Sequence, residues 1–196
     1  VEKVADDVWA LATHLRAERF TLVSHSLGTL IALSLMRTRK QNVVSAIFLS
    51  PVFGISSVWW MPGARVFLAT YVAVAGALPF SSEPRGHVDY SEYRPTGDWT
   101  PSRIFADMRN TTVRVYAYCL KHMYLSDTDA WWSDLQIPVL IVHGTRDTIV
   151  PVLNAVRLSH AIPGSKLVLL EGANHILPVN NFEEVKKIIE DFVAAR

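Results

Sequence analysis

The chain has 196 residues, half of them hydrophobic, and a formal net charge of +1. This length and apolar fraction are typical of a compact domain with a sizeable core. The near-neutral charge and the lack of a basic run with interleaved aromatic residues argue against nucleic acid as a partner. The single cysteine excludes an internal disulfide, and the seven histidines lack metal-ligand spacing. We therefore expect neither a metal nor another cofactor.

The chain opens with valine and leucine residues at helical spacing over residues 1–15, which predicts an amphipathic helix with a solvated polar side. A short β-type run follows at residues 20–23. The pentapeptide Ser-His-Ser-Leu-Gly at residues 24–28 comes next and leads into an apolar helix that extends to about Arg37. A strand, a small-residue turn and a helix are the context in which a strained elbow exposes a serine hydroxyl. Ser26 is therefore a candidate nucleophile.

The residues on either side of Ser26 leave an alternative open. The elbow needs small residues two positions before and two after the serine, because strand and helix approach closely there. Gly28 fits this requirement, whereas Ser24 stands where a glycine is usual. A helix that merely begins with Ser and Gly as capping residues would show the same five letters.

Further strands and helices alternate downstream, apart from one long interruption. Apolar runs predict strands at residues 43–49, 137–143 and 166–170, and a helix is expected between the last two at residues 151–161. The final helix is expected to begin at Asn181, with Glu184 completing a capping box, and to bury the apolar residues from Phe182 to Val193. Such alternation predicts an α/β fold with a parallel sheet flanked by helices.

Two further polar residues follow predicted strands. Asp147 lies in the turn after the strand at 137–143, and His175 lies in the loop after the strand at 166–170. Reactive groups gather beyond the carboxyl ends of parallel strands, so Ser26, Asp147 and His175 are expected on one rim. Taken singly, Asp147 reads as a turn aspartate and His175 as a loop histidine. Their order and contexts together resemble the α/β-hydrolase family.

The resemblance implies roles for four residues. Ser26 would be the nucleophile, His175 the general base and Asp147 the acid that orients the imidazole, while the backbone N–H of Leu27 would bind the oxyanion. The implied activity is hydrolysis of a small, uncharged, fairly apolar carboxylic ester through an acyl-enzyme. Acyl transfer, carbon–carbon bond hydrolysis with the same three residues, and a non-catalytic hydrolase-like protein remain open.

Between residues 51 and 134 the alternation stops and the composition shifts to tryptophan, tyrosine and proline. In the resembled family this is the position of a helical lid, so we expect a core of residues 1–50 and 135–196 and a lid of residues 51–134. Trp59 and Trp60 are expected to pack within that lid, and a helix is expected from Thr100 to about Leu125. Proline and glycine interrupt its most apolar part, so we do not expect membrane contact.

The resemblance also implies that the strand at residues 20–23 is the fifth of eight and that the first four strands lie outside this sequence. The second oxyanion donor would then be missing as well, so we expect a weak catalyst that self-associates through an exposed strand edge. No signal peptide is readable, and the single cysteine suits a reducing compartment, so a cytoplasmic location is expected.

Overall fold

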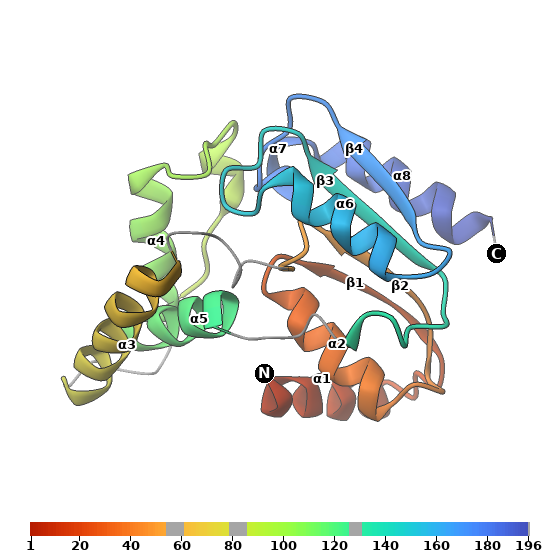
Figure 1. Ribbon diagram of the computed structural model, residues 1–196, viewed down its shortest axis with the longest axis horizontal. Helices are drawn as coiled ribbons and strands as arrows, with labels where there is room; N and C mark the ends of the chain where they lie inside the picture. Colours follow the sequence, from red (N-terminus) through yellow and green to blue (C-terminus); the bar gives the residue numbers. More distant parts are fainter. Residues whose placement is uncertain (54–60, 79–85, 126–130, 196) are drawn as a thin grey trace. The chain divides into compact units, whose positions relative to one another are not determined.

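The computed structural model describes residues 1–53, 61–78, 86–125 and 131–195 (Figure 1). Two compact units are present: a core unit, Val1–Phe53 with Thr128–Arg196, and a helical unit, Gly54–Asp127. These bounds differ from the expected ones at residues 50/51 and 134/135. Phe53 and Trp132 pack into the hydrophobic cluster of the core unit, which accounts for the wider core.

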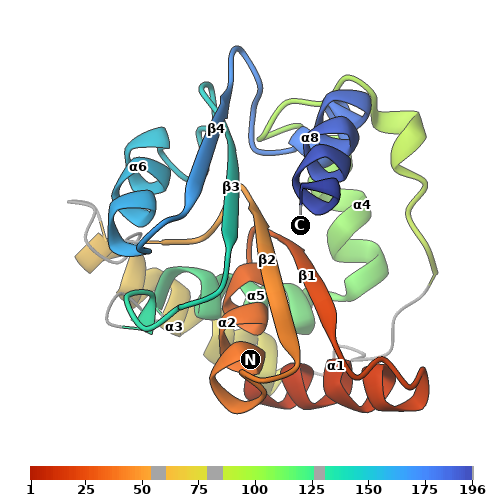
Figure 2. The same ribbon diagram turned by 90° about the vertical axis from the view of Figure 1, so that its right-hand side faces the viewer.

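A four-stranded parallel sheet forms the centre of the core unit, in the order β1-β2-β3-β4 (Figure 2). The strands are β1 (Phe20–His25), β2 (Val43–Leu49), β3 (Val139–Gly144) and β4 (Lys166–Leu170). Strands β2 and β3 are central and almost wholly buried, which explains why their sequences are continuous apolar runs. The expected α/β class with a parallel sheet is confirmed.

Helices cover both faces of this sheet. They are α1 (Glu2–His14), α2 (Gly28–Thr38), α6 (Val152–Ala161), α7 (Leu177–Asn180) and α8 (Phe182–Ala194). One hydrophobic cluster joins α2 and α6 to one face of β2 and β3, and a second joins α7 and α8 to the opposite face (Figure 2). Alternate residues of each central strand, such as Phe48 and Leu49, enter opposite clusters.

The start of the last helix differs from the expectation. The prediction of a capping box is wrong. The side chain of Asn181 makes no hydrogen bond that caps the helix, and its Nδ2 instead lies 3.4 Å from Glu184 Oε2. The short helix α7, which the sequence pattern did not predict, precedes Asn181, and the backbone N–H of Asn181 bonds to Leu177 O. Asn181 therefore lacks the extended backbone that a side-chain cap needs. Phe182 and Val193 are 46% and 47% exposed rather than buried.

The helical unit contains α3 (Met61–Ala77), the 3₁₀ turn η2 (Tyr90–Tyr93), α4 (Pro101–Thr111) and α5 (Val113–Leu125). The single helix expected from Thr100 to Leu125 is wrong, because the chain breaks at Thr112, where φ is 74°. Trp59 and Trp60 lie outside the described residues. None of the helices that the structure describes is long and apolar enough to cross a membrane.

Candidate active site

The three residues singled out in the sequence lie together at the carboxyl ends of the strands. Ser26 directly follows β1, Asp147 comes three residues after β3, and His175 comes five residues after β4. Nε2 of His175 lies 2.8 Å from Ser26 Oγ, and Nδ1 lies 2.7 Å from Asp147 Oδ2. A continuous chain of hydrogen bonds therefore runs from the hydroxyl through the imidazole to the carboxylate.

The partners of His175 fix the position of its proton. A carboxylate only accepts hydrogen bonds, so Nδ1 carries the proton and donates it to Asp147. In the neutral ring Nε2 is then an acceptor, and the Ser26 hydroxyl donates to it. His175 and Asp147 are only 3% and 7% exposed, so water competes little for either bond. The imidazole is held in the orientation in which it could take a proton from Ser26.

The backbone at Ser26 is strained. Its φ is 51°, in the left-handed region that residues with a side chain seldom adopt. The Ser26 N–H donates to Leu49 O at 3.0 Å, while Ser26 O accepts from both the N–H and the hydroxyl of Thr29. These bonds anchor the turn to β2 and to the first turn of α2. The side chain of Ser26 is thereby presented beyond the end of the sheet.

Residues 24 and 28 lie close to each other at this turn. A Cβ atom added at Gly28 would lie 3.5 Å from the Cβ of Ser24, which is ordinary van der Waals contact. Ser24, which stands where a glycine is usual, therefore leaves room even for a methyl group at position 28.

The carboxylate of Asp147 is tightly bound on both oxygens. Oδ1 accepts from the N–H groups of Ile149 and Val150 at 2.9 and 2.7 Å, which leaves Oδ2 for His175. Burial alone would raise the pKa of Asp147. The hydrogen bonds from His175 and Val150, together with the nearby imidazoles, outweigh burial and hold this pKa below its usual range. Asp147 is therefore ionised at neutral pH.

The structure adds His143, which the sequence pattern had indicated only as a strand-end residue. It is fully buried, and its Nε2 lies 2.9 Å from Val150 O and 3.3 Å from Asp147 Oδ2. Both neighbours are acceptors, so Nε2 carries the proton. Burial lowers the pKa of His143 against the opposing effect of Asp147. A neutral imidazole thus lies beside the same carboxylate oxygen that His175 contacts.

Gly144 is a second residue whose importance the sequence did not reveal. A Cβ atom there would lie 2.3 Å from the carbonyl oxygen of Ala173 and 2.8 Å from that of Asn174. Only glycine permits this approach between the end of β3 and the loop that carries His175. The N–H of Arg146 also donates to Ala173 O at 2.9 Å. The turn of Asp147 and the loop of His175 are therefore fastened backbone to backbone.

Two neighbours complete the arrangement. Nε2 of His25 lies 2.9 Å from the backbone oxygen of His175, so the residue before Ser26 also anchors the histidine loop. The backbone N–H of Leu27, by contrast, has no hydrogen-bond partner among the described residues. An N–H at the start of a helix is a suitable donor to a developing negative charge.

No group of three metal-binding side chains occurs in the parts of the chain that the structure describes.

Comparison with known proteins identifies the family. A sequence model of the alpha/beta hydrolase fold matches residues 1–182. The chain belongs to the α/β-hydrolase fold family. Solved structures agree with this family's fold: an esterase from Thermogutta terrifontis has a TM-score of 0.69 at 20% identity and is matched over 99% of this chain and 72% of its own. The enol-lactonase from Burkholderia xenovorans has a TM-score of 0.69 at 23% identity, over 98% of this chain and 72% of its own.

Sequence relatives of this hydrolase-fold protein are distant. The protein named carbamate hydrolase RutD of Rhizobium rhizogenes is 23% identical over 207 residues, which cover the whole of this chain and 75% of RutD. The serine hydrolase BPHL of Mus musculus is 37% identical over a shorter stretch of 59 residues, which covers 30% of this chain and 20% of BPHL. Both relatives are named as hydrolases.

Proposed function

We propose that this protein is a serine hydrolase that cleaves small, uncharged, fairly apolar carboxylic esters through an acyl-enzyme. One observation carries the proposal: the hydrogen-bonded chain from Ser26 through His175 to Asp147. A serine hydroxyl is a weak nucleophile until a neighbouring base removes its proton. The distance of 2.8 Å between Nε2 of His175 and Ser26 Oγ supports His175 as this base.

The mechanism follows from these positions. Ser26 Oγ attacks the ester carbonyl carbon while its proton passes to Nε2 of His175. The imidazolium that forms is stabilised by the ionised Asp147. His175 then returns the proton to the leaving alkoxide, which departs and leaves the acyl group on Ser26. A water molecule, deprotonated by the same nitrogen, releases the acid and restores the serine.

The tetrahedral intermediate needs donors for its oxyanion. The N–H of Leu27 directly follows the nucleophile and has no other partner among the described residues, so it is the donor we propose. The left-handed backbone at Ser26 lies in the sharp turn between the end of β1 and the start of α2. A turn of this kind is the nucleophile elbow of the family.

The helical unit supports a preference for neutral substrates, with the unit acting as a lid. Its sequence is rich in tryptophan, tyrosine and aliphatic residues and has no cluster of arginine or lysine. Two of its arginines are used for internal contacts: Arg103 binds Asp107 at 2.7 Å, and Arg114 donates to the carbonyl of Leu78 at 2.9 Å. A pocket for phosphate or carboxylate groups would be expected to gather several cations. Neutral acyl groups are therefore the expected substrates.

The comparisons support cleavage of carboxylic acid derivatives in general. Among the similar structures are esterases and an enol-lactonase, and a lactone is a cyclic ester that the same attack would open. The name of the relative RutD refers to carbamates, and a carbamate also contains an acyl carbon. The first assay panel should therefore contain short aryl esters, a lactone and a carbamate.

The proposal is tested by the hydrolysis of p-nitrophenyl butyrate. We expect turnover by the unmodified chain that is lost on Ser26→Ala and retained on Ser133→Ala, a change at an exposed serine of the core unit. Rapid mixing should show an initial burst of nitrophenol if the acyl-enzyme accumulates. Hydrolysis that survives Ser26→Ala would refute the mechanism. Transfer of the butyryl group to an added alcohol in preference to water would favour the acyltransferase alternative.

A further inference from the structure

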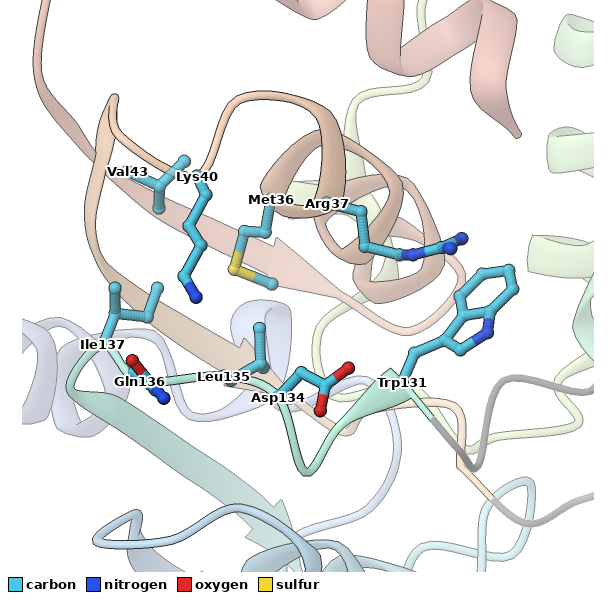
Figure 3. Close-up of a pocket in the computed structure, with 9 residues that line it drawn as sticks. All are labelled: Met36, Arg37, Lys40, Val43, Trp131, Asp134, Leu135, Gln136 and Ile137. Carbon is cyan, nitrogen blue, oxygen red and sulfur yellow. The ribbon is translucent and has the colours of Figure 1, made fainter.

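A hollow lies in the core unit, at the opposite end of the sheet from Ser26. It has a volume of about 240 Å³ and lies between the last turn of α2, the start of β2 and residues 131–137 (Figure 3). Val43 is the first residue of β2, and Ile137 precedes β3 by two positions, so the hollow adjoins the amino ends of these strands. It shares no residue with the hydrogen-bonded chain described above.

The inner wall of this hollow is apolar. Met36, Val43 and Leu135 are 2%, 3% and 8% exposed, and Figure 3 shows the side chains of Met36 and Leu135 pointing into the space. Ile137 extends the same wall. Such a surface favours the hydrocarbon part of a ligand, because its transfer from water releases about 25 cal/mol per Å² of apolar area.

The mouth of the hollow is polar and unevenly charged. Lys40 reaches across it toward the side chain of Gln136, and Asp134 lies at the other end beside Trp131 (Figure 3). The guanidinium of Arg37 stacks on the ring of Trp131, 3.9 Å from its centre. Lys40 makes no hydrogen bond or ion pair with any residue that the structure describes. At one end of the mouth, the Lys40 ammonium, which lacks a hydrogen-bond or ion-pair partner among the described residues, therefore lies near the Gln136 amide.

We propose that this hollow binds a small amphipathic carboxylate. Its hydrocarbon part would lie against Met36, Val43 and Leu135, and its carboxylate would accept hydrogen bonds from the Lys40 ammonium and the Gln136 amide. The volume lies below the range of about 300–1,000 Å³ for drug-sized ligands, which indicates a medium-length chain or a single ring. A large or polyanionic ligand would also meet the opposing charge of Asp134.

The site can be tested with sodium octanoate and the methionine methyl groups. The chain has four methionines, and Met36 is the one in the core unit; Met61, Met108 and Met123 belong to the helical unit. In protein with ¹³C-labelled methionine methyl groups, the Met36 signal is assigned by its loss in Met36→Leu. We expect octanoate to shift this signal in a saturable manner. Acetate, which lacks the chain, and octanol, which lacks the charge, should bind more weakly.

Charge reversal supplies the decisive comparison. Lys40→Glu should weaken octanoate binding by about three- to tenfold, the effect of losing one exposed ion pair and adding a repulsion. Lys3→Glu makes the same change at an exposed lysine of α1 outside the hollow, and it should leave binding unchanged. A Met36 signal that does not respond to octanoate, or equal effects of the two substitutions, would overturn the proposal. The outcome does not depend on Ser26, so it is independent of the proposed hydrolysis.

Discussion

At the scale of single residues, the proposed reaction depends on two groups that do different things. His175 moves the proton, whereas Asp147 fixes the tautomer of His175 and stabilises its charged form. We expect His175→Ala and Asp147→Asn each to lower kcat for ester hydrolysis by about ten-thousand-fold, with the histidine change the larger. Steady-state kinetics measure this. An Asp147→Asn variant with unchanged kcat would show that another carboxylate orients the histidine.

The burial of His143 predicts how the stability of the fold depends on pH. Burial lowers its pKa in the folded protein, whereas in the unfolded chain it titrates near the ordinary value of about 6.5. Below that pH the unfolded state gains a proton that the folded state does not, so stability is present above about pH 6.5 and falls as the pH drops through it. One such proton contributes up to about 1.4 kcal/mol per pH unit. The slope should be smaller in His143→Gln.

Urea unfolding between pH 5 and 8 measures this slope. The control is His160→Gln, which changes an exposed histidine on α6 and should keep the slope of the unmodified chain. If His143→Gln and the unmodified chain lost stability in parallel below pH 6.5, the neutral, buried state of His143 would be wrong.

At the scale of elements, the site depends on the contact between the end of β3 and the loop after β4. Gly144→Ala would place a Cβ 2.3 Å from Ala173 O, and no flexible side chain can give way, so the backbone must shift. Overpacking of this kind costs about 1–3 kcal/mol. We expect lower stability and a displaced His175, hence a lower kcat. Gly28→Ala is the matched control, since its Cβ meets Ser24 only at 3.5 Å. Equal effects of the two changes on kcat and unfolding would contradict this account.

The sequence predicted those elements whose signal is local. Apolar runs located the strands, and the turn at residues 24–28 and the loops after β3 and β4 located Ser26, Asp147 and His175. The break at Thr112 was missed because no glycine or proline marks it. The role of Gly144 was missed for a different reason: its contact with Ala173 joins segments that only the folded sheet brings together. The role of His143 depends on the conformation of the turn after β3, which places its Nε2 3.3 Å from Asp147 Oδ2.

At the scale of the whole molecule, the exposed edge of the sheet predicts association between copies of the chain. In the described residues β1 pairs only with β2, so its other edge carries unpaired N–H and C=O groups (Figure 2). Val23 on this strand is 49% exposed. Exposed apolar edge strands pair with other chains, and charge suppresses such pairing. We expect the 196-residue chain to self-associate, and Val23→Lys to reduce association more than Leu153→Lys, a change on the exposed side of α6.

Size-exclusion chromatography with light scattering, over a range of concentrations, measures this association. A chain that stays monomeric at every concentration would contradict the role of the β1 edge. Association that Leu153→Lys reduces as much as Val23→Lys would indicate a different surface.

The central claim is that the fold activates Ser26, and labelling with a fluorophosphonate tests it most directly, because this reagent reacts with an activated serine whatever the natural substrate is. Intact mass and peptide mapping should show one adduct, at Ser26, that is absent in Ser26→Ala and forms far more slowly in His175→Ala. A correctly folded chain that remains unlabelled, or an adduct at any other residue, would contradict the claim.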